Sequence, residues 1–222
     1  MTNQEIVSPI TQSFLRIHKA ITRGLNVSID RGTEYIDKGA PTGELWKGYV
    51  DYVFSLIQAL TTHHIGEDEV AFPALKAALP RAPFNQLISD HQLIVSQIKP
   101  STQALEMIAE GNTEQLTRLV EHLENILALW KPHIRMEETA FSSGAISAAI
   151  PFEQQVQINA DWGKFSQEHS THPFLAIPFV LYNLNLEDRA ELEASLPPVV
   201  RDELLPKEWK PRWAPMKPFL LE

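Results

Sequence analysis

The chain carries two short stretches of one pattern, HHIGE at residues 63–67 and HIRME at residues 133–137. In each, a histidine precedes a glutamate by four residues, and both stretches lie in segments of strongly helical pattern. Because residues four apart share one face of an α-helix, each stretch brings an imidazole and a carboxylate together. Two further histidines, His18 and His91, lie singly on two other helical segments. This distribution of ligands over four helices favours a metal centre inside a four-helix bundle.

Four long segments have apolar residues at every third or fourth position, which is the period of an amphipathic helix. The expected helices span about residues 9–38, 44–72, 84–110 and 113–141. The first has a clear start signal, because Ser8 is a capping residue and Pro9 suits the first helical position. Candidate kinks or stops are Pro73, Pro100, Pro132 and the segment 110–112. Short connections between these helices predict an all-α fold, an antiparallel up-and-down four-helix bundle.

The C-terminal part, residues 144–222, is predicted to be a helical extension of a bundle formed by residues 1–143. Smaller helices are expected near residues 152–168, from residue 172 onward, and near residues 187–196. The last stretch interleaves prolines with Trp209, Trp213 and Phe219. Because so much aromatic surface would be costly to leave in water, we expect an extended tail laid across the bundle.

The composition excludes several classes of function. The chain has 222 residues, of which 44% are hydrophobic, enough for one substantial core. Its 19 basic residues are scattered and outnumbered by 28 acidic residues, so the charge pattern of a nucleic-acid binder is missing. There is no cysteine, so any metal must be held by nitrogen and oxygen. Without a signal-peptide pattern or an apolar run of about 18 residues, we expect a cytoplasmic protein that does not enter a membrane.

Counting residues along the expected helices places four histidines at one depth. His18 and His63 each lie about 19 residues from the first connection, or about 28 Å at 1.5 Å per residue. His91 and His133 lie about 19 and 20 residues from the third connection, again at matching heights. The glutamates one turn beyond the paired histidines belong to the same layer. The predicted ligands are therefore His18, His63, Glu67, His91, His133 and Glu137.

The types of ligand narrow the choice of metal. Imidazole and carboxylate without sulfur suit iron, manganese or zinc. Carboxylates in a bundle core with a histidine one turn away are the arrangement found in di-iron and di-manganese sites. Four histidines and two glutamates are too few to fill two octahedral ions, so positions would remain open for water, oxygen or a peroxide.

Four histidines outside this set are predicted to have surface or turn roles: His64, His122, His169 and His172. His64 is expected to form a solvated pair with Asp68, since both lie one position off the apolar stripe of their helix. Trp130 lies one turn before the histidine of the fourth helix and is expected to be part of the core.

The sequence resembles the hemerythrin-like, HHE cation-binding family over about residues 8–143. The resemblance rests on His18 and on residues 63–73, 90–92 and 133–138. It implies an antiparallel four-helix bundle that holds a non-haem di-iron centre. Members of such a family bind oxygen, sense oxygen or iron, or handle peroxide and nitric oxide. The positions that match the family pattern are the six predicted ligands.

Two departures from the family pattern bear on the ligands. Oxygen carriers have a second histidine four residues after the ligand of the third helix, where this chain has Val95. One iron would then be poorer in nitrogen, which argues against simple reversible oxygen carriage. Carriers also place the last carboxylate five residues after the histidine of the fourth helix. That position is Glu138 here, so Glu137 and Glu138 are alternative ligands.

The leading hypothesis is a di-iron protein that binds oxygen or a related small oxidant for a binding, sensing or storage role. The first alternative is an enzyme, a di-iron oxidase or oxygenase or one that handles peroxide or nitric oxide, with the aromatic tail as roof of a substrate pocket. The second alternative is a metal-free helical interaction module. The sequence leaves the metal, the substrate and the oligomeric state open.

Overall fold

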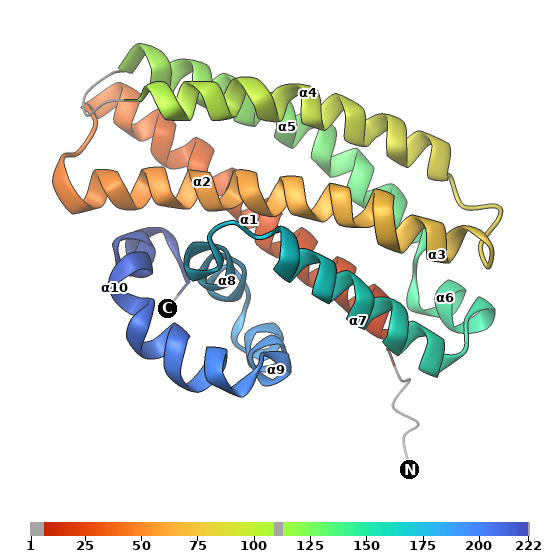
Figure 1. Cartoon of the computed structure of the whole chain (residues 1–222). Coiled ribbons are helices and arrows are strands. Elements are labelled where there is room, and N and C mark those ends of the chain that lie inside the picture. The colour runs from red at the N-terminus through yellow and green to blue at the C-terminus, as the bar shows by residue number, and fades with distance from the viewer. Residues whose placement is uncertain (1–6, 109–112, 222) are drawn as a thin grey trace.

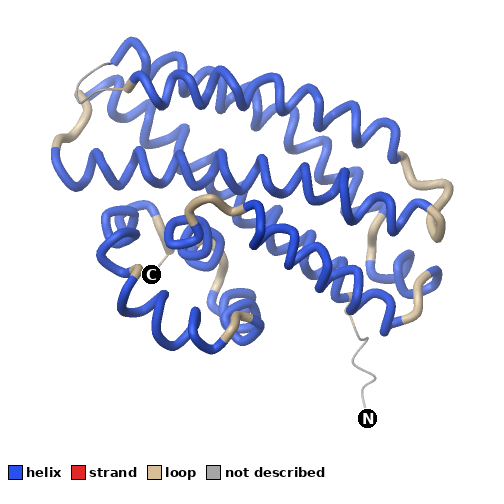
Figure 2. Tube along the Cα trace, in the orientation of Figure 1, coloured by secondary structure: helices blue, strands red, loops and turns tan. Residues whose placement is uncertain are grey.

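Every regular element in the described part of the chain, residues 7–108 and 113–221, is a helix (Figure 1, Figure 2). This computed structural model confirms the all-α class that the sequence predicts. The first six elements are α1 (Pro9–Lys38), α2 (Gly43–Gly66), η1 (Glu67–Ala71), α3 (Phe72–Lys76), α4 (Phe84–Met107) and α5 (Thr113–Ala140). The expected helix stop at residues 110–112 lies outside the described residues. Among the helices described, none is both long and apolar enough to cross a membrane.

The four long helices pack side by side, and each contacts two of the others. Helix α1 packs on α2 and α5, and α4 packs on the same two helices (Figure 1). As predicted, α1 begins directly after Ser8, whose side chain accepts a hydrogen bond from the backbone N–H of Thr11 at 3.3 Å. Capping of this kind satisfies one of the backbone donors left free at the start of a helix.

Two separate hydrophobic clusters fill the space between these helices. Along α1, Phe14 belongs to one cluster and Ile21 to the other, and the buried His18 lies between them. The same order of apolar residue, histidine and apolar residue is found on the other long helices. The packing therefore leaves one polar layer between two apolar cores.

The second helix continues past its expected stop through one widened turn. In the π-helical element η1, the N–H of Phe72 bonds the carbonyl of Glu67, five residues earlier. Pro73 has no N–H, and its ring crowds the carbonyl four residues before it, so a wider turn accommodates this proline. Helices α4 and α5 run without interruption through Pro100 and Pro132.

The C-terminal extension consists of helices as far as Phe219. Its elements are α6 (Ser143–Ala149), α7 (Phe152–His169), α8 (Pro173–Tyr182), α9 (Leu186–Ser195), η2 (Val200–Glu208), α10 (Lys210–Trp213) and η3 (Ala214–Phe219). The expectation of an extended tail is therefore wrong. Pro211 and Pro215 fall in the first turns of α10 and η3. In a first turn the backbone N–H has no partner within the helix, so a proline, which has no N–H, does not break the helix there.

The final element η3 packs against the first half of α2. Met216 and Phe219 are buried there, and the ring of Phe219 lies 5.9 Å from that of Tyr49 and 5.7 Å from that of Tyr52. Trp213 and Phe219 of the tail are thus buried and Trp209 is partly buried, as the cost of exposing aromatic residues to water predicts. Helix α7 instead lies along α1 and η1, at the other end of the long helices (Figure 1).

Candidate metal centre

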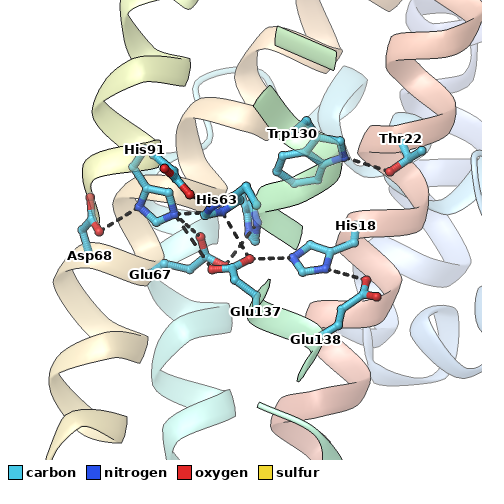
Figure 3. Close-up of polar contacts among 11 residues, drawn as sticks. His18, Thr22, His63, Glu67, Asp68, His91, Trp130, Glu137 and Glu138 are labelled. Carbon is cyan, nitrogen blue, oxygen red and sulfur yellow. Dashed lines mark hydrogen bonds and ion pairs between the residues drawn. The ribbon is translucent and has the colours of Figure 1, made fainter. Parts of the chain in front are cut away.

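The four histidines predicted as ligands meet in the buried polar layer. The ring centroids of His18 and His63 are 5.3 Å apart, and those of His91 and His133 are 4.7 Å apart. Each of the four is at most 4% exposed. The two predicted glutamates, fully buried, lie among them (Figure 3). The structure thus brings together all six residues that the sequence predicts as ligands.

The donor atoms form two groups, each compact enough to surround one ion. The His18 group consists of His18, His63, Glu67 and Glu137, and the His91 group consists of His64, Glu67, His91 and His133. Within each group the donor atoms lie within 4.8 Å of one another. Glu67 belongs to both groups. Its Oε1 lies 3.2 Å from Nε2 of His63, and its Oε2 lies 3.3 Å from Nε2 of His91, so its carboxylate spans the two positions.

Glu137 also faces both groups. Its Oε2 lies 3.2 Å from Nε2 of His18 and 3.3 Å from Nε2 of His133. The neighbouring Glu138 is partly exposed and lies on the outer side of His18, with Oε1 3.0 Å from Nδ1. Of the two alternative carboxylates, Glu137 therefore belongs to the cluster and Glu138 contacts its rim.

His64 is part of the cluster, and its predicted role in a solvated pair is wrong. It is only 1% exposed, and its ring centroid lies 4.4 Å from that of His91 and 5.6 Å from that of His133. Asp68 contacts His91 instead. The reason is that α2 has a long helix on each side, so two successive residues reach the interior: His63 faces α1 and His64 faces α4.

The prediction that one metal position is poorer in nitrogen did not count His64. Val95 is 46% exposed and does not face the cluster. His64 gives the His91 group a third imidazole besides His91 and His133. A histidine from α2 thus lies on the side of the cluster where the family pattern would place a second histidine from α4.

Many polar atoms in the cluster lack the partners that burial normally demands. Within the described residues, the following have no hydrogen-bond partner: both ring nitrogens of His63 and His64, Nε2 of His18, and both carboxylate oxygens of Glu67 and Glu137. A buried polar group without a partner is costly, and a charged one more so. The Nε2 atoms of His91 and His133 also converge, at 3.2 Å. Inward-facing nitrogen and carboxylate donors of this kind fit bound cations. Imidazole and carboxylate are ligand types that suit iron, manganese or zinc.

Burial and contacts between neighbouring residues shift the pKa of two histidines and both glutamates in the cluster. Burial lowers the pKa of His63 and of His64 well below the usual value, so both rings are neutral and keep a free lone pair. Burial raises the pKa of Glu67 well above its usual range. Burial also acts to raise the pKa of Glu137, but its contacts with histidines outweigh that effect and hold the pKa well below normal.

Two tryptophans shield the cluster from water. Trp130 is fully buried, its ring lies 5.7 Å from that of His63, and its Nε1–H donates to Oγ1 of Thr22 at 2.8 Å (Figure 3). Trp162 of α7 stacks over His63 from another side, with centroids 6.0 Å apart and rings inclined by 24°. Gly66 permits this approach, because a Cβ there would lie 2.5 Å from Nε1 of Trp162. Low polarity around the cluster strengthens its electrostatic interactions.

The remaining histidines lie outside the cluster, as the sequence predicts. His122 is partly buried, with Nδ1 3.4 Å from Oε1 of Gln97. His169 is exposed in the last turn of α7 and bonds the carbonyl of Phe165 at 2.9 Å. His172 is exposed at the N-cap position of α8.

These features define a class of protein: a helical protein with a buried histidine and glutamate centre for cations. Residues 10–142 match the family described as Hemerythrin HHE cation binding domain, and the chain belongs to this family. The match confirms the resemblance noted in the sequence. No match was found among curated proteins or among solved structures. Helix α7, which covers the cluster with Trp162, lies outside the matched residues.

Sequence reasoning missed two residues of the centre, His64 and Trp162. The adjacent histidines at 63–64 carry a signal for His64, but a helix with a single apolar stripe would leave it outside the core. Trp162 had no such signal, because only the docking of α7 brings it over His63.

Proposed function

We propose that the protein holds two iron ions in this centre and binds oxygen or a related small oxidant there, in a binding, sensing or storage role. We further propose that the long helices form an antiparallel up-and-down four-helix bundle that presents the ligands. The observation that carries the proposal is the carboxylate of Glu67, which is shared by two compact groups of buried donors. Membership of a cation-binding family supports it.

Each residue of the centre has a role in this proposal. His18, His63 and Glu137 would hold one ion, His64, His91 and His133 would hold the other, and Glu67 would bridge them. Bound iron would supply redox chemistry and open ligand positions. The chain's own contribution is to orient these ligands and to exclude water by means of its tryptophans.

A surface cleft approaches one side of the centre. A cleft of about 430 Å³ between α1 and α5 is lined by His18 and Glu138, together with Lys19 and Asn26. His18 is the member of the His18 group that lines this cleft, and its side chain is almost wholly buried. We propose that the oxidant approaches the centre through this cleft, because a residue of the cluster lines it.

The enzyme alternative has less support from the fold. In this alternative the aromatic tail forms the roof of a substrate pocket at the metal centre. In the structure, Phe219 of the tail packs instead on Tyr49 and Tyr52. Tyr52 precedes His63 by eleven residues, about 16 Å along α2. We therefore retain the binding function as the proposal.

A metal analysis combined with absorption spectra tests this proposal. Protein purified with iron should contain about two equivalents, and the reduced form should develop a new absorption band on exposure to oxygen. A stable and reversible band supports oxygen binding, whereas steady consumption of peroxide or an organic substrate supports the enzyme alternative. Absence of bound iron, manganese or zinc would contradict both.

Metal binding should also raise the melting temperature of the protein. The cluster exists only in the folded state, so an ion that binds it stabilises that state, by about 2.7 kcal/mol at a free metal concentration 100 times Kd. Thermal unfolding of the metal-free protein, with and without added ferrous iron under anaerobic conditions, measures the effect. An unchanged melting temperature at saturating iron would contradict the assignment.

Replacing His64 should remove metal from one group only. His64→Leu takes one imidazole from the His91 group and leaves the His18 group complete, so we expect the content to fall from about two equivalents towards one. His122→Leu, which changes a histidine outside the cluster, is the matched control and should retain the wild-type content. Equal contents in both variants would show that His64 is not a ligand.

A further inference from the structure

Each glutamate of the cluster is followed directly by a second carboxylate residue. Glu67 precedes Asp68, and Glu137 precedes Glu138. In both pairs the first residue is fully buried, and the side chain of the second is 37% exposed. One carboxylate of each pair thus lies inside the cluster and the other lies at its rim.

The two carboxylates of a pair contact both nitrogens of a histidine on another helix (Figure 3). From α5, Glu137 lies 3.2 Å from Nε2 of His18, and Glu138 lies 3.0 Å from Nδ1 of the same ring. From η1, Glu67 lies 3.3 Å from Nε2 of His91, and Asp68 lies 2.9 Å from its Nδ1. The same arrangement therefore occurs once in the His18 group and once in the His91 group.

His18 and His91 differ from His63 and His133 in that no carboxylate follows them by four residues on the same helix. Four residues after His18 is Thr22, and four residues after His91 is Val95. Their rings are therefore oriented from the neighbouring helix. Within the described residues, His63 and His64 have no hydrogen bond at either ring nitrogen. His133 has only Asp90 near its Nδ1, at 3.7 Å, beyond hydrogen-bond distance.

An outer carboxylate decides which ring nitrogen carries the proton. A carboxylate accepts a hydrogen bond, so Nδ1 of the histidine must donate one, and the lone pair of the neutral ring is then on Nε2. In both rings Nε2 is the atom that faces the cluster. Partners of this kind fix the tautomer and the orientation of a histidine that ligates a metal.

We propose that Glu138 and Asp68 are positioning residues, one for each metal position: Glu138 orients His18 and Asp68 orients His91 through Nδ1. The inference rests on the proposed function, because it assigns these carboxylates to a centre that holds metal. It predicts that the metal affinity of each position can be lowered separately, although the two positions share Glu67.

Stepwise titration of the metal-free protein with Zn²⁺ measures the effect on each position. Glu138→Ala and Asp68→Ala should each weaken one of two binding steps by about 10- to 100-fold and leave the other near its wild-type value. Glu138→Gln and Asp68→Asn keep an oxygen that accepts from Nδ1–H, so they should recover much of the lost affinity. Glu124→Ala on α5 and Glu69→Ala on η1 remove exposed carboxylates from the same elements and serve as matched controls.

Nitrogen NMR of the Zn²⁺-loaded protein, labelled at histidine, gives a readout that a loss of folding stability alone would not change. The wild type should show protonated Nδ1 atoms in hydrogen bonds for His18 and His91. Glu138→Ala should lose this signature for His18 alone, and Asp68→Ala for His91 alone.

The outcomes separate the inference from the proposed function. A wild type that binds no Zn²⁺ or iron removes the proposed function, and the inference with it. A wild type with two binding steps whose alanine variants keep both affinities and both Nδ1–H signals overturns the inference alone. Loss of both steps in either variant, with controls unchanged, also overturns it, because the two carboxylates would then not act on separate positions.

Discussion

Glu67→Ala is expected to remove metal from both positions of the centre while the helices remain folded. Glu67 is the one residue shared by the His18 and His91 groups, and each of its oxygens faces a histidine of a different group. Without it, each position loses a ligand and the bridge between them disappears. We expect the metal content, measured after purification with iron, to fall from about two equivalents to near zero.

The same substitution should not destabilise the metal-free protein. In the metal-free state both oxygens of Glu67 are buried without a hydrogen-bond partner among the described residues. Removing a buried polar group that has no partner relieves a cost of desolvation, which offsets the small cavity left behind. The melting temperature of metal-free Glu67→Ala should therefore equal or exceed that of the metal-free wild type.

A matched control separates the role of Glu67 from general effects of charge. Glu69 lies two residues later in η1 and is exposed, so Glu69→Ala removes a carboxyl group from the same element without touching the cluster. It should keep the wild-type metal content. If Glu67→Ala still bound two equivalents, the bridging role would be wrong. If it lost metal only because it failed to fold, circular dichroism would show the loss of helix.

Gly48→Ala is expected to cause the largest loss of folding stability among small substitutions. A Cβ at Gly48 would lie 1.9 Å from the backbone carbonyl oxygen of Pro215, where η3 crosses α2. Backbone atoms cannot turn aside as a flexible side chain can, so the C-terminal segment must move. Such overpacking costs on the order of 3 kcal/mol, which chemical denaturation followed by circular dichroism would measure.

The position of the loss can be observed as well as its size. If η3 is pushed from α2, Met216 and Phe219 lose their buried environment, and the C-terminal segment should become sensitive to protease before the rest of the chain. Gly163→Ala is the matched control, because a Cβ at this exposed position in α7 meets nothing within 4 Å. It should be neutral or stabilising by up to about 1 kcal/mol. Equal stability of Gly48→Ala and wild type would show that η3 does not rest on α2 as described.

Local rules account for the long helices and for most residues of the cluster. Ser8 and Pro9 mark the start of α1, and the apolar period continues to Lys38, so this helix could be predicted almost to the residue. The four histidines could be placed at one depth because the rise of an α-helix is constant and the connections are short. Such arguments need only distances along the chain.

The same rules were not enough where a proline can be accommodated by more than one type of helical turn, or where segments distant in the sequence pack together. Pro73 was expected to end or kink the second helix, and the structure has a widened turn, η1, directly before it, which packs on α7. The prolines of the tail indicated an extended segment, yet those at 211 and 215 stand where a helix tolerates them. The apolar pattern does not show whether a helix will start just before a given proline.

The chain's local patterns were enough for the all-α class, for six residues of the centre and for the nitrogen and oxygen character of any metal site, because these depend on helical period and residue type. The tertiary structure decided the rest. It brought His64 inside because α2 lies between two neighbours, placed Glu137 within the cluster and Glu138 at its rim, and laid Trp162 over His63. These outcomes depend on the side from which a neighbouring helix approaches, and spacing along one helix carries no information about that.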